Sequence, residues 1–166
     1  MKLTPAIKGL ITGLLMLATA LAIFYAKLPA DSQFQYIVYV LYALGIAWTV
    51  LSFGRSPAFT GKFSELFGQG FRCFIVVTLI MVTFTGVFSN MHPEFAEEAS
   101  VAYKEQLIAQ KNKSNKTPAQ IDEEVATLKK QYTLRLVSAS IFGYLVIGAI
   151  TTAAVAGLVL ITRRNQ

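Results

Sequence analysis

The chain has 166 residues, of which 54% are hydrophobic and only 14% are charged, and it carries a formal net charge of +6. A soluble globular chain typically has about 25% charged residues, so this composition excludes an ordinary water-soluble domain. The single cysteine excludes an intramolecular disulfide. Membrane orientation accounts for the basic excess, so the charge does not call for a nucleic-acid partner.

Four long stretches without Asp, Glu, Lys or Arg predict four transmembrane helices. Each stretch has 18 or more residues, and about 20 apolar residues cross a hydrocarbon core ~30 Å thick. A charge at mid-span would cost about 2.5–3.5 kcal/mol on insertion, which explains why none is present. We therefore predict an all-α integral membrane protein that forms one membrane domain over residues 1–166. The predicted spans cover approximately residues 7–26, 35–54, 71–91 and 136–162.

The basic residues predict which side of the membrane faces the cytoplasm. The amino end, the segment between spans two and three, and the carboxyl end together hold seven basic residues and one acid, Glu65. The first loop and the segment 91–135 each have equal numbers of basic and acidic residues. By the positive-inside rule both termini are cytoplasmic, so residues 92–135 lie on the periplasmic side of a bacterial inner membrane. The seven basic residues are Lys2, Lys8, Arg55, Lys62, Arg72, Arg163 and Arg164.

Residues 92–135 are polar but patterned, and they predict a helical hairpin between spans three and four. Pro93 suits a first helical turn, and the good helix formers that follow it end at Asn112–Lys116. Thr117 and Gln120 then form a capping-box signature at the start of a second helix. We predict that membrane helices three and four extend outward as this antiparallel pair.

Apolar residues at helical spacing predict how the two hairpin helices face each other. Their spacing of three or four residues places each set on one helix face. A pair that meets along one stripe is marginal alone, so we expect a partner or a second copy to cover it. The stripe of the second helix is Ile121, Val125, Leu128 and Tyr132, and the weaker facing stripe is Phe95, Ala99, Ala102 and Leu107.

The stretch FSELFGQGFR, residues 63–72, is the candidate contact site on the cytoplasmic side. Its aromatic residues fall at helical spacing, which predicts a short amphipathic helix in the inner membrane interface, with a bend into span three at its two glycines. One interpretation is a bent helix entry with Arg72 anchored among headgroups. The other is recognition of a polyprenyl-phosphate-like lipid by backbone N–H groups and Arg72. The predicted lipid- or partner-binding residues are Lys62, Phe63, Phe67, Gly68, Gly70 and Arg72.

Small residues at four-residue spacing predict close helix packing, because they let helix backbones approach each other in lipid. Packing inside one chain and dimerisation both remain open for these residues. They are Gly9 and Gly13 on the first span, and Ala149, Ala153 and Gly157 on the fourth.

The remaining polar residues do not form a catalytic constellation, so we predict no catalytic residue, no metal site and no cofactor. His92 is the only histidine, and no nucleophile has a plausible base partner. A nucleotide P-loop at Gly61-Lys62 fails, because Phe63 stands where serine or threonine is needed. The expected function is non-catalytic, that of an accessory or scaffold subunit of an inner-membrane complex. The alternative is a small transporter or pore subunit for a neutral solute.

The charged-then-apolar amino end, the FSELFGQGFR stretch and the His-Pro-Glu-Phe start of the polar segment resemble a known family. It is the domain of unknown function 4199, a family of small four-helix membrane proteins of Bacteroidetes, and the resemblance covers essentially the whole chain. The resemblance implies no established activity. It does imply a partner, a cytoplasmic glycosyltransferase that uses lipid-linked sugars. A homo-oligomer is the other partner that we expect beside the lipid bilayer.

Overall fold

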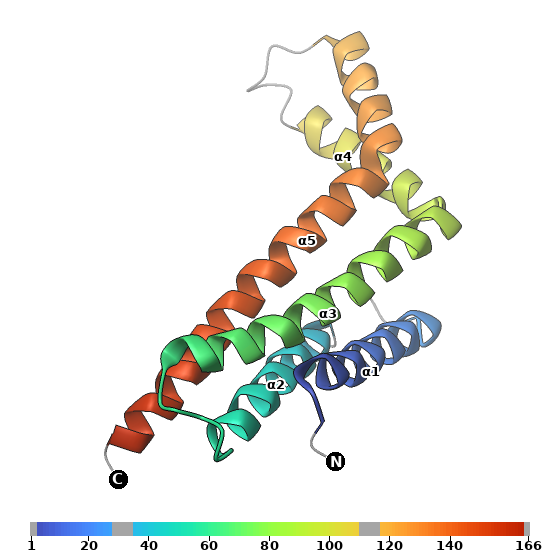
Figure 1. The fold of residues 1–166 in the computed structure, drawn as a ribbon. Helices are drawn as coiled ribbons and strands as arrows, with labels where there is room; N and C mark the ends of the chain where they lie inside the picture. The colour runs from blue at the N-terminus through green and yellow to red at the C-terminus, as the bar shows by residue number, and fades with distance from the viewer. Residues whose placement is uncertain (1–2, 28–34, 110–116, 165–166) are drawn as a thin grey trace. The chain divides into compact units, whose positions relative to one another are not determined.

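The computed structural model describes residues 3–27, 35–109 and 117–164. These residues form five α-helices and, within the described ranges, no strand: α1 (Pro5–Tyr25), α2 (Gln35–Gly54), α3 (Phe63–Met91), α4 (Glu94–Ala109) and α5 (Pro118–Arg164). Figure 1 shows them in chain order. The helices α1, α2, α3 and α5 are each long and apolar enough to cross a membrane. The chain is therefore an all-helical, multi-pass membrane protein.

The chain divides into two compact units, which are described separately. The first, the bundle, comprises residues 1–82 and 141–166, and the second, the module, comprises residues 83–140. The bundle thus contains α1, α2, most of α3 and the carboxyl-terminal part of α5. The module contains α4 together with the neighbouring ends of α3 and α5.

Within the bundle, α2 contacts α1 and α5, and α3 contacts α1. Gly45 on α2 lies directly against the Thr12 side chain on α1, and the Tyr42 hydroxyl on α2 donates a hydrogen bond of 2.9 Å to the Tyr144 carbonyl oxygen on α5. Gly9 on α1 lies against the backbone carbonyl of Cys73 on α3. The buried hydroxyl groups of Thr12 and of Thr49 donate to their own helices, so they cost little inside an apolar bundle.

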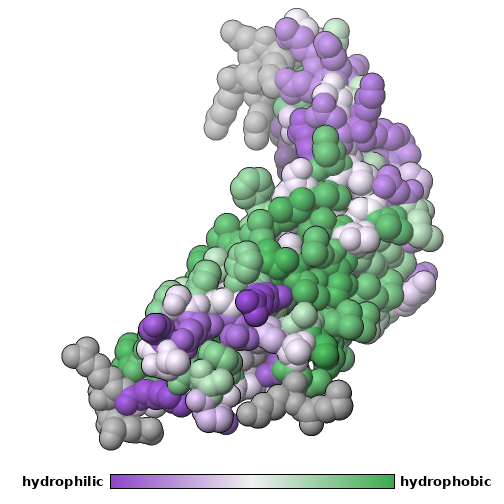
Figure 2. Space-filling model, in the orientation of Figure 1, coloured by the Kyte–Doolittle hydropathy of each residue, from purple (hydrophilic) through white to green (hydrophobic). Residues whose placement is uncertain are grey.

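Large apolar side chains on the outward faces of the spans are exposed. Leu44, Leu79, Phe142 and Ile150 each have 60% or more of their surface accessible. In Figure 2 the surface over the spans is correspondingly hydrophobic, whereas hydrophilic residues gather over α4. A continuous apolar surface of this extent is stable only in an apolar solvent, which here is the lipid bilayer.

In the module, α4 runs antiparallel to the first part of α5. Glu97 forms an ion pair of 2.9 Å with Lys129, and Lys104 forms one of 2.7 Å with Asp122, so residue numbers rise along α4 as they fall along α5. The paired groups are about half exposed or more, so each pair fixes register more than it adds stability. The joining residues 112–116 lie outside the described ranges.

The sequence located the start of α5 correctly. The Gln120 side-chain oxygen accepts from the Thr117 N–H at 2.9 Å, and the Gln120 N–H donates to the Thr117 hydroxyl at 3.4 Å. This is the predicted capping box, and it satisfies two N–H groups at the beginning of the helix.

The facing stripe on α4 differs from the prediction. Ile121 and Leu107 are buried as expected, but Ala102 is exposed, whereas Ser100 is buried.

A second difference concerns the helix that precedes α4. The polar segment does not continue α3, which ends at Met91; α4 begins separately at Glu94, after Pro93. Proline removes a backbone N–H and fixes φ, so a new helix starts here more easily than the old one continues.

The junction between α3 and α4 should be sensitive to acid. The N–H of Glu94 and then the His92 ring, whose Nδ1 lies 2.6 Å from Oε1, hydrogen-bond the Glu94 carboxylate and hold its pKa below the ordinary value. A carboxylate with a lowered folded-state pKa stabilises the folded form above its ordinary pKa of about 4.3, and this stabilisation is lost as pH falls through the lowered value.

We therefore expect amide exchange at the first turn of α4, corrected for intrinsic rates, to become faster as pH falls through this window. The variant Glu94→Gln should show faster exchange at neutral pH and little further change on acidification. A variant with the same pH dependence as the original chain would contradict this assignment.

Candidate functional site

The stretch FSELFGQGFR forms the first turns of α3 and is not a separate interfacial helix. The helix begins at Phe63 and continues without interruption to Met91. Glu65 in the first turn accepts hydrogen bonds from the Thr60 N–H at 3.0 Å and from the Thr60 hydroxyl, which ties the preceding loop to the helix start. The two predicted bend residues, Gly68 and Gly70, therefore lie inside a regular helix.

This placement corrects the expected phosphate cradle. The free N–H groups of a helix belong to its first four residues, which here begin at Phe63. Gly68, Gly70 and Arg72 lie beyond that turn, where N–H groups are bonded within the helix. Any anion bound near Arg72 would meet a side chain and no free backbone.

The other residues of the predicted contact site are partly brought together. Lys62 precedes the helix and is exposed, and Phe63 stacks on Phe67 with ring centroids 5.8 Å apart. Phe63 is 44% exposed, so the pair presents aromatic surface outward. Arg72 is exposed as well, and binding of lipid or partner by this set stays a prediction.

Gly70 has a packing role. A Cβ atom at Gly70 would meet the Thr152 side chain on α5 and lie 3.0 Å from a Val50 methyl group on α2. A Cβ atom at Gly68 would meet nothing within 4 Å. Of the two glycines, only Gly70 is therefore needed for the close approach of three helices.

On the first span the predicted packing residues are at a helix contact. A Cβ atom at Gly9 would lie 2.6 Å from the Cys73 carbonyl oxygen, and one at Gly13 would meet the Ile80 side chain. Both contacts are to α3 of the same chain, so this Gly-x-x-x-Gly stripe packs within the bundle.

On α5 the predicted packing stripe is displaced by one residue. Ala149 and Ala153 are only partly buried, and a Cβ atom at Gly157 would meet nothing within 4 Å. The buried residues are instead Gly148, Thr152 and Ala156. Small residues occur on both faces of α5, so their spacing alone did not identify the face that meets α2 and α3.

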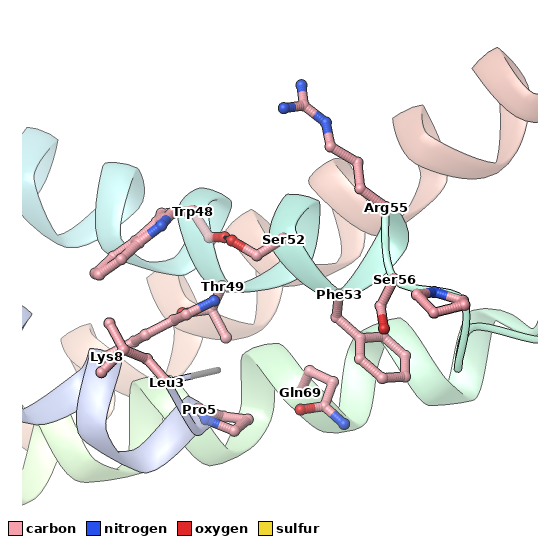
Figure 3. A pocket seen from close by; sticks show the side chains of 11 residues that line it. Leu3, Pro5, Lys8, Trp48, Thr49, Ser52, Phe53, Arg55, Ser56 and Gln69 are labelled. Atoms are coloured by element: carbon pink, nitrogen blue, oxygen red, sulfur yellow. Dashed lines mark hydrogen bonds between the residues drawn. The ribbon is translucent and has the colours of Figure 1, made fainter. Parts of the chain in front are cut away.

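A pocket of about 410 Å³ opens where the amino end of α1 meets the carboxyl end of α2, with α3 beside it (Figure 3). Figure 3 shows the Lys8 side chain reaching from α1 toward α2, whereas the Arg55 guanidinium extends away from it. The Lys8 Nζ atom lies 5.1 Å from the centre of the Trp48 ring, a cation–π contact. The lining residues are Leu3, Pro5, Lys8, Trp48, Thr49, Ser52, Phe53, Arg55, Ser56, Pro57 and Gln69. We call this the Lys8–Trp48 pocket.

A neighbouring pocket of about 500 Å³ lies between the carboxyl ends of α2 and α5. One of its lining residues, Arg163, donates a hydrogen bond to the Gly54 carbonyl oxygen and lies 4.9 Å from the Phe59 ring centre. Gly54 ends α2, so the Arg163 cation satisfies a carbonyl at the negative end of that helix. The Arg163 guanidinium is therefore engaged by groups of the protein itself. The other cation that lines this pocket is Arg55, which is exposed.

The module carries two adjacent hollows between α4 and α5, of about 500 and 440 Å³. Tyr103, Leu128 and Arg135 line both of them. The second is lined mainly by apolar residues, among them Ala99 and Ala102 from α4 and Tyr132 and Leu136 from α5. We call the two together the module groove.

The chemical capacity of these sites is for binding. Among the described residues, no three of His, Cys, Asp and Glu gather as they would around a metal ion. The charged, aromatic and amide groups of the Lys8–Trp48 pocket suit an anion that carries an apolar portion.

Sequence reasoning counted Lys8 only as one of the cytoplasmic charges and did not select it as a site residue. Two signals pointed to it: it stands at the start of the first predicted span, and Trp48 stands near the inner end of the second. Because the two residues are 40 positions apart in the chain, only the antiparallel contact of α1 and α2 brings them together.

Comparison with known protein families matches residues 8–160 to the family described as protein of unknown function (DUF4199). No curated protein and no solved structure matches the chain significantly. The family match extends from the first turn of α1 almost to the end of α5, and thus covers both the bundle and the module. The resemblance seen in the sequence is confirmed, and the chain belongs to the DUF4199 family.

Proposed function

We propose that the protein is a non-catalytic accessory or scaffold subunit of a bacterial inner-membrane complex. In this proposal both termini and the Lys8–Trp48 pocket are cytoplasmic, and the module is a helical hairpin on the periplasmic side. The charge distribution supports this orientation: seven basic residues and one acid lie at the ends of the spans that carry the termini and the α2–α3 loop.

The observation that carries the proposal is the module groove. The α4 helix and the first part of α5 meet along one stripe and are held by two exposed ion pairs, yet two hollows remain open between them. One of the two hollows is lined mainly by apolar residues, and such a helix pair gains stability when a third apolar segment enters it. The groove therefore suits a helix or an apolar segment of a partner subunit.

The identity of the partner rests on different grounds. A cytoplasmic glycosyltransferase that uses lipid-linked sugars is suggested only by the family resemblance. The groove favours a partner that has an extracytoplasmic segment, or a second copy of this chain. A membrane enzyme that itself has a cytoplasmic catalytic part and a periplasmic segment would satisfy both expectations.

The test is purification of the tagged full-length chain from native membranes. We expect a partner, or a second copy, in stoichiometric amount. The variant Ala102→Lys places a long cation in the groove from an exposed position and should abolish the association. The matched control Val101→Lys adds the same residue at the adjacent position, which is 53% exposed and does not line the groove. This variant should retain the association with the partner.

Two results would contradict the proposal. The first is a monomer without partner in both variants and in the original chain. The second is solute or ion flux in liposomes that contain the pure protein, which would favour the alternative, a small transporter or pore subunit for a neutral solute.

A further inference from the structure

We propose that the Lys8–Trp48 pocket binds the phosphate group of an anionic phospholipid. This assignment goes beyond the scaffold role and does not depend on it, since it concerns the bundle and not the module groove. Three observations support it: the burial of the Lys8 side chain, the residues that line the pocket around it, and the apolar surface that continues from the pocket.

Lys8 is a buried cation without an acidic partner among the described residues. Only 8% of its surface is accessible, although it lies inside a helix that crosses the membrane. The one acid at this end of the bundle, Glu65, is bonded to Thr60. The described contact of Lys8 is with the Trp48 ring, which stabilises the ammonium group but does not neutralise it. A buried charge in a membrane segment normally has a counter-ion or a functional role.

The polar groups of the pocket favour an anion as that counter-ion. No acidic residue lines the pocket. Gln69 is partly exposed and brings an amide donor from α3, and Arg55 extends from the rim, where it is exposed. Lys8 supplies an ammonium group and Gln69 an amide donor for the oxygens of a phosphate group, whereas the Arg55 guanidinium extends away from the pocket and adds positive charge at its rim.

The surroundings favour a lipid as the source of the phosphate. The pocket walls include the apolar residues Leu3, Pro5 and Phe53. From Lys8 an exposed apolar stripe continues along α1 through Ile11 and Leu15.

A matching stripe continues along α2 from Trp48 through Leu44, which is 60% exposed. Because α1 and α2 contact each other, as the Thr12–Gly45 approach shows, acyl chains have a continuous apolar path beside the bound headgroup. Free phosphate would leave this path unused.

Trp48 is the only tryptophan in the chain, so its fluorescence reports on this pocket alone. The full-length protein is reconstituted in phosphatidylcholine bilayers that contain a small fraction of brominated lipid, because bromine on the acyl chains quenches a nearby indole. One preparation carries brominated phosphatidylglycerol and the other carries brominated phosphatidylcholine in equal amount. We expect stronger quenching by the phosphatidylglycerol, since that lipid accumulates beside Trp48.

Two variants connect this preference to Lys8. Lys8→Met keeps the apolar stem and should lower the preference for phosphatidylglycerol by roughly fivefold, the equivalent of one cation close to an anionic headgroup. Lys8→Arg should retain it. The matched control Lys27→Met removes one charge from an exposed position at the other end of α1 and should leave the preference unchanged.

Three outcomes would overturn the assignment. Equal quenching of the original chain by the two brominated lipids would exclude selective lipid binding without reliance on any variant. An unchanged preference in a folded Lys8→Met protein would exclude Lys8. Relief of the quenching by millimolar inorganic phosphate, but not by the same concentration of chloride, would show that the pocket takes free phosphate and that the lipid is not its ligand.

Discussion

Replacing Gly148 by alanine should lower the thermal midpoint of the detergent-solubilised protein by roughly 3–10 °C, which corresponds to about 1–3 kcal/mol of overpacking. A Cβ atom at Gly148 would lie 2.5 Å from the Tyr42 hydroxyl oxygen and 2.8 Å from a Phe74 ring carbon. Both neighbours belong to rigid aromatic rings on two different helices, so neither can move away without a shift of its helix. The loss should be visible as an earlier collapse of the monodisperse peak in size-exclusion chromatography after heating.

The matched control is Gly157→Ala on the same helix. A Cβ atom there meets nothing within 4 Å, and alanine favours a helix over glycine by roughly 0.5–1 kcal/mol. We expect an unchanged or slightly higher midpoint. If the two variants behaved alike, the close contact at Gly148 would be contradicted. If Gly157→Ala were the more damaging, the buried stripe of α5 would be the one predicted from the sequence.

The second large effect is expected at Tyr42, whose side chain is fully buried where α2 meets α5. Its ring lies edge-on to Tyr144, with centroids 5.5 Å apart. In Tyr42→Ala the lost contacts leave a cavity that the neighbouring helices cannot fill, at a cost of roughly 2 kcal/mol or more. Lipid is as apolar as the bundle interior, so this cost comes from packing and not from transfer out of water.

The variant Tyr42→Phe separates the ring from the hydroxyl group. It removes the hydroxyl group and with it the 2.9 Å hydrogen bond to the Tyr144 carbonyl, for which we expect a loss of about 0.5–1.5 kcal/mol. Thermal midpoints of both variants, measured in the same detergent, give the comparison. A loss in Tyr42→Phe as large as that in Tyr42→Ala would show that the hydrogen bond, and not packing, holds α2 against α5.

Membrane crossing and the helices of the module were predictable from the sequence because each depends on local patterns. Long uncharged runs identify the spans without knowledge of their neighbours. The Thr117–Gln120 capping box acts within one helical turn, and the structure contains both of its hydrogen bonds. The beginning of α4 after Pro93 is local as well, although the resulting break after Met91 was not foreseen.

The parts of the site that were not predictable depend on contacts between distant segments. Gly148 and Ala149 are adjacent small residues, and only the positions of Tyr42 and Phe74 show that residue 148 is the one with no room for a Cβ atom. The glycines of FSELFGQGFR suggested a bend, but Gly70 stays helical, in a place where Thr152 of α5 leaves no room for a side chain. Spacing along one helix contains no information about the surface of the next helix.

The orientation of the chain is the central claim of the proposed function, and thiol labelling tests it directly. In a Cys73→Ala background, which removes the single buried cysteine, one new cysteine is placed at Ala58 in the α2–α3 loop or at Ala126 in the module; both positions are exposed. A membrane-impermeant maleimide applied to intact cells should label Ala126→Cys at once. It should label Ala58→Cys only after the inner membrane is permeabilised. Labelling of Ala58→Cys in intact cells, with protection of Ala126→Cys, would contradict the account.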